Sequence, residues 1–432
     1  MKVTGTQLVT FIGKDGGYFF MLAGNIAFMI ICSAMVFFMT PGLAFFYGGM
    51  VRRKNVVNTI LSSFFICGLA SAMWIAFGYS ISFSGDVGGL GIIGNLKNFC
   101  LEGVSLQSPD GESIPDALFC VFQMMFAIIT PALITGSLIG RMKFSKLIMF
   151  IAIWSLIVYY PLAHMQWGGG LLDRIGAIDF AGGNVVHISS GVSGLVASIV
   201  LGKRRGYGAM EYRPHNVPFI VLGAAILWFG WFGFNAGSSL AADGLAVHAF
   251  ITTNTSAAMG LLSWMLIEGI ILGKPTATGA ATGAVLGLVA ITPGAGYVPI
   301  WASFIIGALV SPICYFAISK VKAKLGYDDA LDAFGCHGVG GIWGGIATGI
   351  FATHQVNDST KYQGLITGDY RLFLAQIGAV LITAAFAGIA TFIIMNILKA
   401  CRGVRISTED EAVGMDISQH EEKAYPAFTG LD

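Results

Sequence analysis

The chain has 432 residues, of which 55% are hydrophobic and only 11% are charged, and its formal net charge is +1. A soluble domain carries about 25% charged residues, so the composition excludes an ordinary soluble protein, which needs a hydrated, charged surface. The near-zero net charge gives no sign of a nucleic-acid partner. Long apolar stretches between short basic clusters instead predict an integral membrane protein of α-helices, since each span needs roughly 20 apolar residues.

Eleven apolar segments follow one another along the chain, and each is predicted to be a transmembrane helix in an all-α fold. The eighth differs from the others in being rich in Gly, Ala and Thr (TGAATGAVLGLVAITPGAG). The approximate limits of the segments are 19–48, 56–82, 116–140, 147–165, 184–202, 217–238, 248–272, 279–296, 298–319, 333–352 and 371–399.

The distribution of Lys and Arg predicts the orientation, because connections on the cytoplasmic side are enriched in these residues. Of the 24 basic residues, 18 fall in the connections after the first, third, fifth, seventh and ninth spans and in the C-terminal segment, for example Arg52, Arg53 and Lys54 or Lys203, Arg204 and Arg205. The six others fall in the alternating connections and the N-terminal segment. With an odd number of spans, this bias places the N-terminus outside and the C-terminus in the cytoplasm.

Two parts of the chain differ in character. Residues 1–400 hold the eleven spans and form the predicted transmembrane channel domain, whereas residues 401–432 are acidic and polar. The second part is predicted to be a cytoplasmic tail, either a solvated terminus or a regulatory segment.

The two halves of the membrane domain resemble each other weakly. The fifth segment carries Asp179 and His187 (DFAGGNVVHISSGVSGL), and the tenth carries Asp332 and His337 (DAFGCHGVGGIWGG). Transporters often contain inverted repeats whose Gly-interrupted segments meet at the substrate site. We therefore predict an inverted repeat of five plus five helices followed by one extra helix.

Ionisable residues inside a span are costly and become candidate functional residues. His187 and His337 each lie in an apolar, Gly-rich segment, and a facing pair of neutral imidazoles can share one proton. Asp179, just outside the fifth span, can cap a helix or attract cations near a vestibule, and we leave both roles open. Asp332 is interpreted as structural.

Trp167 precedes three glycines at the outer end of the fourth span. An interfacial Trp is common at such a position, but an indole beside an irregular loop can also offer its face to a cation. A metal site formed by His164, Asp179 and His187 is a weak alternative, and we expect neither a metal nor a cofactor.

These residues lie in motifs that resemble the ammonium transporters of the Amt/Mep/Rh family, and more closely its Amt branch. The resemblance runs from PGLAFFYGGMVRRKN in the first span to GMDISQHEEKAY in the tail. Its most specific motifs are WGGGLLDRIGAIDFAGGNVVHISSGVSGLVASIVLGKR (167–204), WFGWFGFNAGS (228–238) and DAFGCHGVGGIWG (332–344).

The resemblance implies a homotrimer in the cell membrane, with one pore for ammonium or ammonia in each subunit. It assigns an outer ammonium-binding site to Trp167, Ser238 and Phe126, and a stacked gate to Phe126 and Phe234. It places His187 and His337 along a narrow apolar pore and gives Asp179 a supporting role. Whether the net transported species is ammonium or ammonia stays open.

The tail departs from the family pattern, in which Gly follows the His, because Glu421 follows His420 here. Contact with a PII-type signal protein at the cytoplasmic face is therefore in doubt. A sensor that reports ammonium through the tail is an alternative, although about thirty residues are too few for a signalling domain. A Rh-like gas channel needs no outer cation site, and an enzyme lacks a third catalytic group beside the histidines, so we expect no enzyme.

Overall fold

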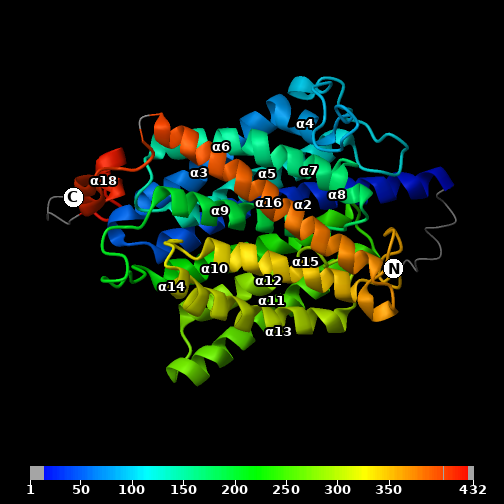
Figure 1. The fold of residues 1–432 in the computed structure, drawn as a ribbon. Helices are drawn as coiled ribbons and strands as arrows, with labels where there is room; N and C mark the ends of the chain where they lie inside the picture. The colour runs from blue at the N-terminus through cyan, green and yellow to red at the C-terminus, as the bar shows by residue number, and fades with distance from the viewer. Residues whose placement is uncertain (1–13, 402, 427–432) are drawn as a thin grey trace, which may run out of the picture.

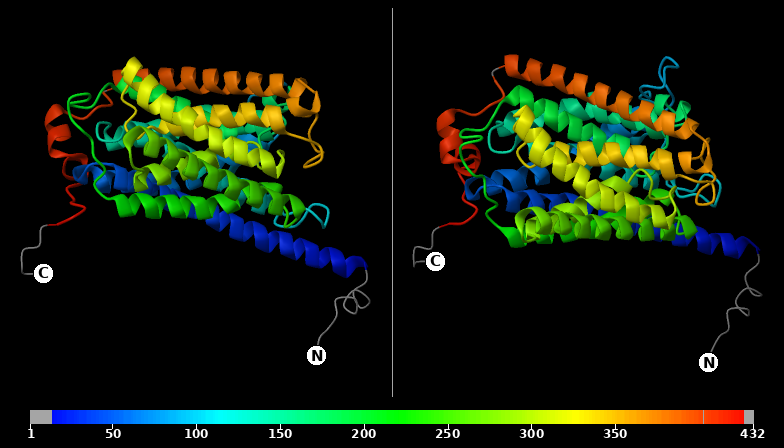
Figure 2. Two further views of the ribbon diagram at one scale, coloured as in Figure 1. Left: turned by 90° about the horizontal axis from the view of Figure 1, so that it is seen from below. Right: turned by 60° about the horizontal axis from the view of Figure 1, so that its bottom comes forward.

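The structure is a computed structural model that describes residues 14–401 and 403–426. Residues 1–13, on which the predicted outer N-terminus falls, lie outside the described residues. Long helices run side by side along one common direction, and the C-terminal helices lie at one end of this bundle (Figures 1 and 2). The described residues contain only helices, loops and two isolated bridges, so the predicted all-α class is confirmed.

All eleven predicted segments are helical, and five of them contain a stretch of π-helix. They are α2 (Lys14–Met50); α3 (Val56–Met73), η2 (Trp74–Gly78) and α4 (Tyr79–Phe83); α5 (Asp116–Leu138); α6 (Phe144–Trp154), η4 (Ser155–Tyr159) and α7 (Tyr160–Trp167); η5 (Gly183–Ile188) and α9 (Ser189–Leu201); α10 (Val217–Ala236); α11 (Gly244–Leu272); α12 (Ala277–Ile291); α13 (Ile300–Phe316), η7 (Ala317–Val321) and α14 (Lys322–Leu325); η8 (Phe334–Gly338) and α15 (Val339–Phe351); and α16 (Arg371–Ala400).

Nine helices of the described chain are long and apolar enough to cross a membrane, judged by length and composition. The helix at the Gly- and Ala-rich eighth segment, α12, has only 15 residues. Large apolar side chains such as Phe64, Ile270 and Leu381 are more than 60% exposed on the outside of the bundle. Helices that are apolar on their outer faces as well as their inner ones are suited to lipid, and the chain is a multi-pass membrane protein.

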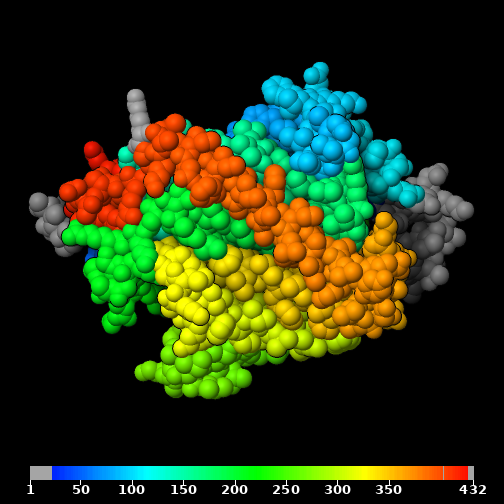
Figure 3. All heavy atoms as spheres, viewed as in Figure 1, coloured from blue at the N-terminus to red at the C-terminus, as the bar shows by residue number. Residues whose placement is uncertain are grey.

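Helices from the N-terminal and C-terminal halves of the chain pack together. Helix α2 lies along α10, while η5 and α9 contact η8 and α15 near the centre. Helix α16 runs diagonally across one face, over elements of both halves (Figure 3).

The central contact depends on a glycine. A Cβ added at Gly191 of α9 would overlap the backbone of Gly338 and lie 2.9 Å from the carbonyl carbon of His337. Small residues let membrane helices approach backbone to backbone, and here they bring the two histidine-bearing segments together.

The tail packs onto the end of the bundle that carries the basic loops, which we call the basic end. Helices α17 (Thr408–Val413) and α18 (Met415–His420) lie there. The Met415 N–H donates to Asn55 Oδ1 at 3.0 Å, and the Asn58 N–H donates to Asp416 Oδ1 at 2.9 Å. These bonds tie the tail to the start of α3.

Candidate functional site

Trp167 ends α7 at the end of the bundle opposite the tail, where a short loop of glycines replaces the helix. Its indole Nε1–H donates to the backbone oxygen of Asp179 at 2.9 Å, which fixes the plane of the half-buried ring. Phe126 of α5 meets this ring edge to face, with centroids 6.0 Å apart and planes at 81°. The structure thus brings together two of the three residues predicted for the outer site.

Asp179 is 5% exposed, and its carboxylate caps the start of η5. Its two oxygens accept from the backbone N–H groups of Gly182 (2.8 Å), Gly183 (2.6 Å), Asn184 (2.7 Å) and Val185 (3.3 Å). A carboxylate at a helix N-terminus satisfies donors that otherwise lack partners and interacts favourably with the helix dipole. Of the two roles that the sequence left open, these contacts are those of a cap.

Ser238, the third predicted residue, follows α10 in the short helix η6 (Gly237–Ser239). Its hydroxyl donates to the backbone oxygen of Phe234 at 2.9 Å. Because the hydroxyl proton is used in this bond, the oxygen lone pairs remain available to accept from a ligand.

The two phenylalanines of the predicted gate stack on each other. The rings of Phe126 and Phe234 have centroids 4.2 Å apart and planes inclined by 32°, and each side chain is 1% exposed. Two rings this close leave no gap between them, so passage needs them to move.

Below the phenylalanines lie the two histidines, each within a stretch of π-helix, η5 or η8. His187 Nδ1 and His337 Nδ1 are 3.3 Å apart, and the rings are nearly parallel at 18°. One Nδ1 must donate and the other accept, so the pair holds a single proton between these atoms. Among the described residues, His187 Nε2 is buried without a hydrogen-bond partner.

A small enclosed chamber surrounds this pair. Its volume is about 10 Å³, room for about one water molecule. Its walls are apolar or aromatic except for the imidazoles of His187 and His337. The other lining residues are Met39, Leu43, Phe46, Ile129, Leu133, Val186, Leu227, Trp231, Phe234 and Val285.

The sequence analysis missed Trp231 as part of this chamber. Its ring stacks on His187 with centroids 5.5 Å apart, and its Nε1–H donates to Thr292 Oγ1 at 2.9 Å. Its position three residues before Phe234 places both side chains on one face of α10, and this spacing within WFGWFGFNAG could have identified it.

Asp332 and His164 lie outside the chamber lining. Asp332 accepts from Lys322 Nζ at 2.6 Å at the basic end, as an ion pair. His164 Nδ1 lies 3.0 Å from the backbone oxygen of Ser82, and its Nε2 lies 3.5 Å from Asp86. No cluster of three metal-ligating side chains occurs within residues 22–401 and 403–426.

The chain is similar to known proteins over nearly all of its length. Residues 27–425 match the family described as Ammonium Transporter Family. The chain is 50% identical to an ammonium transporter of Bacillus subtilis over 406 residues, which cover 94% of this chain and 99% of that one. It is 46% identical to ammonium transporter Amt1 of Archaeoglobus fulgidus, over 93% of this chain and 99% of the relative.

Solved structures agree. The crystal structure of Saccharomyces cerevisiae Mep2 matches with a TM-score of 0.85 and 35% identity, covering 94% of this chain and 93% of that one. A structure named Sensor Amt Protein also matches with a TM-score of 0.85, at 27% identity, over 93% of this chain and 99% of that one. With the family match and relatives of this identity, the chain belongs to the ammonium transporter family.

Proposed function

We propose that the chain transports ammonium by binding the ion at an outer site, removing its proton and passing ammonia through the histidine chamber. The observation that carries this proposal is the chamber itself, an apolar space with room for about one water molecule, in which two imidazoles face each other directly below two stacked phenyl rings. Such a space suits a small neutral molecule that can both donate and accept hydrogen bonds.

The outer site consists of Trp167, Phe126 and Ser238. Ammonium is attracted to the face of an aromatic ring by an interaction of about 0.5–2 kcal/mol, and it can donate to the free lone pairs of Ser238. Potassium can also be coordinated by that oxygen, but it has no proton to lose, so it cannot become a neutral molecule that enters the apolar chamber.

The proton must pass to water at the outer site, above the phenylalanines, because an ion in the chamber loses its hydration and finds no opposite charge there. Transfer of an unpaired ion into an apolar interior costs many kcal/mol, whereas a neutral amine that makes hydrogen bonds avoids most of this cost. Ammonia can then donate to one imidazole nitrogen and accept from the other. The histidine pair either only guides ammonia or also relays the proton, and the experiment below distinguishes the two.

The proposal also includes the topology, the division of the chain and the assembly of the protein. Eleven spans place Trp167 outside and the basic end in the cytoplasm, in line with the distribution of Lys and Arg. Residues 1–400 form the channel and 401–432 the regulatory tail, in a homotrimer with one pore per subunit. A PII-type signal protein is a candidate partner at the cytoplasmic face.

A role as a sensor is the second candidate, favoured by the likeness to the Sensor Amt Protein. In that case the docked tail would report occupancy of the outer site, with little flux through the chamber. Measured transport therefore separates the two functions.

The test uses the full chain in liposomes on a solid-supported membrane, with currents recorded after ammonium jumps. The variants are His187→Ala/His337→Ala and, as a matched control, His354→Ala, whose side chain is exposed outside the chamber. We expect current with ammonium and none with potassium in the unsubstituted protein and the control. Loss of current in the double variant assigns the charge-carrying step to the pair, whereas alkalinisation of the lumen without current assigns neutral conduction. If well-inserted protein gives neither a current nor alkalinisation of the lumen, the proposal of transport is refuted.

A further inference from the structure

A basic cavity lies at the basic end of the bundle, apart from the histidine chamber. Its volume is about 290 Å³, and it opens between the loop after α2, the loop after α9 and the tail. The residues that matter in its wall are Arg52, Lys54, Arg204, Arg205, Tyr212 and Glu411. Small-molecule sites begin at about 300 Å³, so the cavity has room for a small ligand.

The two carboxylates nearest these cations are already used. Asp328 binds Arg204, with Oδ1 2.6 Å from Nη2, and Glu411 binds Arg405 at 2.8 Å. Hydrogen bonds from Arg204 overcome the effect of burial and lower the pKa of Asp328, so this ion pair persists at neutral pH.

Three cations remain without a carboxylate partner among the described residues. Lys54 Nζ donates only to the backbone oxygens of Glu411 (2.8 Å) and Ala412 (2.5 Å). The side chains of Arg52 and Arg205 form no ion pair in the described part of the chain. The cavity therefore carries an excess of positive charge that is not neutralised by the protein.

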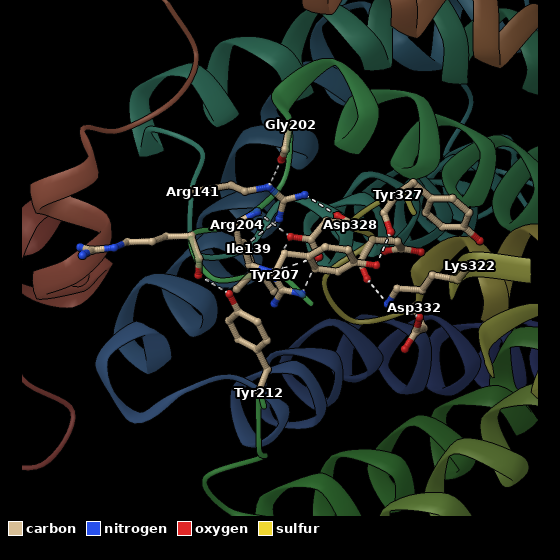
Figure 4. A network of polar contacts seen from close by, with 12 residues as sticks. Ile139, Arg141, Gly202, Arg204, Tyr207, Tyr212, Lys322, Tyr327, Asp328 and Asp332 are labelled. Atoms are coloured by element: carbon tan, nitrogen blue, oxygen red, sulfur yellow. Dashed lines mark hydrogen bonds and ion pairs between the residues drawn. The ribbon is translucent and has the colours of Figure 1, made fainter. Parts of the chain in front are cut away.

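Two of the arginines in the wall, Arg52 and Arg204, are held in place by stacking, whereas the side chain of Arg205 is exposed. The ring of Tyr212 has the guanidinium of Arg52 over it at 4.3 Å and that of Arg204 at the same distance. Stacking uses the face of a guanidinium and leaves its in-plane N–H donors available, which suits an oxyanion. Figure 4 shows Arg204 and Tyr212 within a wider network in which Arg141 donates to the backbone oxygens of Gly202 (2.8 Å) and Asp328 (2.5 Å).

We propose that the basic cavity binds a phosphate group, supplied either by a soluble phosphate compound or by the headgroup of an anionic lipid. The phosphate oxygens accept from Arg52, Arg205 and Lys54, which neutralises the excess charge. Because these residues lie on two loops and contact the tail, the bound phosphate joins the three segments and holds the tail in its docked position.

Purified full-length chain in detergent is titrated with pyrophosphate, and binding is followed by the shift of the unfolding temperature at constant ionic strength. The variants are Arg52→Gln, Arg205→Gln and the two together. The substitution Arg205→Gln should disturb the fold little, because the hydrogen bonds of Arg205 are made by its backbone N–H and carbonyl groups, which the substitution keeps. The control is Arg213→Gln, an exposed residue of the same loop that pairs with Glu211 at 2.7 Å outside the cavity.

We expect saturable binding that weakens at least about tenfold in the double variant, since one charge-assisted hydrogen bond is worth about that factor. The control should bind as the unsubstituted protein does, and pyrophosphate should slow trypsin cleavage after Arg405 and Lys423, the basic residues on either side of the tail helices. Absence of saturable binding, or an equal loss in Arg213→Gln, would overturn the proposal.

Nanodiscs distinguish the two sources of phosphate. If the lipid headgroup is the occupant, phosphatidylglycerol nanodiscs will weaken pyrophosphate binding relative to phosphatidylcholine nanodiscs. If a soluble compound is the occupant, the protein will bind pyrophosphate equally well in both kinds of nanodisc. Neither result depends on ammonium transport, so failure of this site is separable from failure of the proposed function.

Discussion

The contact between the two histidine-bearing segments can be tested with one methyl group, in Gly191→Ala. The added Cβ would lie 2.5 Å from the Cα of Gly338 and 2.9 Å from the carbonyl carbon of His337. Carbon atoms in contact prefer about 3.5–4.0 Å, so α9 and η8 must separate by about 1 Å. The obstructing atoms belong to the backbone and cannot rotate away as a side chain would.

The separation should affect both stability and transport. Overpacking of a tight core costs about 1–3 kcal/mol. His187 lies one helical turn before Gly191, so a shift of this size stretches the 3.3 Å contact between the two Nδ1 atoms beyond hydrogen-bonding range. It also enlarges a chamber of about 10 Å³ enough to admit additional water. We expect a lower unfolding temperature and a loss of most of the ammonium current.

The matched control is Gly388→Ala on α16, which faces the same helix α9. Its Cβ would meet only side-chain atoms, Val192 Cγ1 at 3.4 Å and Val196 Cγ2 at 3.8 Å. Ordinary contacts of this kind should change the free energy of unfolding by less than about 0.5 kcal/mol. Both variants are measured by thermal unfolding in detergent and by current in liposomes. Full current and an unchanged unfolding temperature in Gly191→Ala would refute the argument that backbone contact sets the histidine distance.

Two further predictions concern the tail. Glu421 adopts the left-handed conformation after α18, with φ 56°, so Glu421→Gly should remove a strain of about 1 kcal/mol and slow trypsin cleavage of the tail. His420 Nε2 accepts from Asn58 at 2.9 Å only when the ring is neutral, and burial lowers the pKa of His420, opposed in part by Asp416 and Glu422. The pKa of His420 is therefore higher in the undocked tail than in the docked tail, so the undocked form binds a proton first as the pH falls below about 6.5. Docking should weaken from that pH downward, and trypsin should then cleave the tail faster.

Each of these two predictions has its own control. For Glu421, the variant Glu421→Ala removes the carboxylate but keeps the backbone strain, so equal slowing of trypsin cleavage by Ala and by Gly would contradict the conformational explanation. For the pH effect, His420→Gln keeps an acceptor for Asn58 and should not respond to pH between 7.5 and 6. Asp416 acts in the opposite direction at lower pH, because burial raises the pKa of its carboxyl group and a protonated carboxyl favours the docked tail. A pH response that persists in His420→Gln would therefore assign the effect to another group.

Hydropathy placed all eleven helical segments, because a bilayer imposes a length and an apolar composition that are local properties of the chain. The ends were less accurate. The fourth segment was predicted as 147–165, but α6 begins at Phe144 and α7 ends at Trp167. The extension at its end matters, since it places Trp167 on the last turn of a helix rather than in the loop that follows.

The candidate site was predictable where its chemistry is unusual for a membrane. His187 and His337 were found because ionisable groups are rare in spans, and the structure puts them in contact. Trp231 was missed because an indole in an apolar segment has no such signal. Its three-residue spacing from Phe234 was the one available hint, and the contact of its ring with His187 shows its place. The cap made by Asp179 was undecided because the same carboxylate before the same helix suits either role until its hydrogen bonds are known.

The basic cavity illustrates a different limit. Positive residues in cytoplasmic loops are expected of any membrane protein, so Arg52 and Arg205 carried information about orientation only. Their proposed role in binding phosphate depends on which carboxylates are already paired. Those pairs are set by contacts between parts of the chain that the sequence does not show to be close: Asp328 binds Arg204, and Glu411 binds Arg405. A cluster of like charges that stays unneutralised after folding is held together against its own repulsion by the fold. An oxyanion bound there reduces that repulsion, and if it also favours the docked tail, docking favours its binding by the same factor.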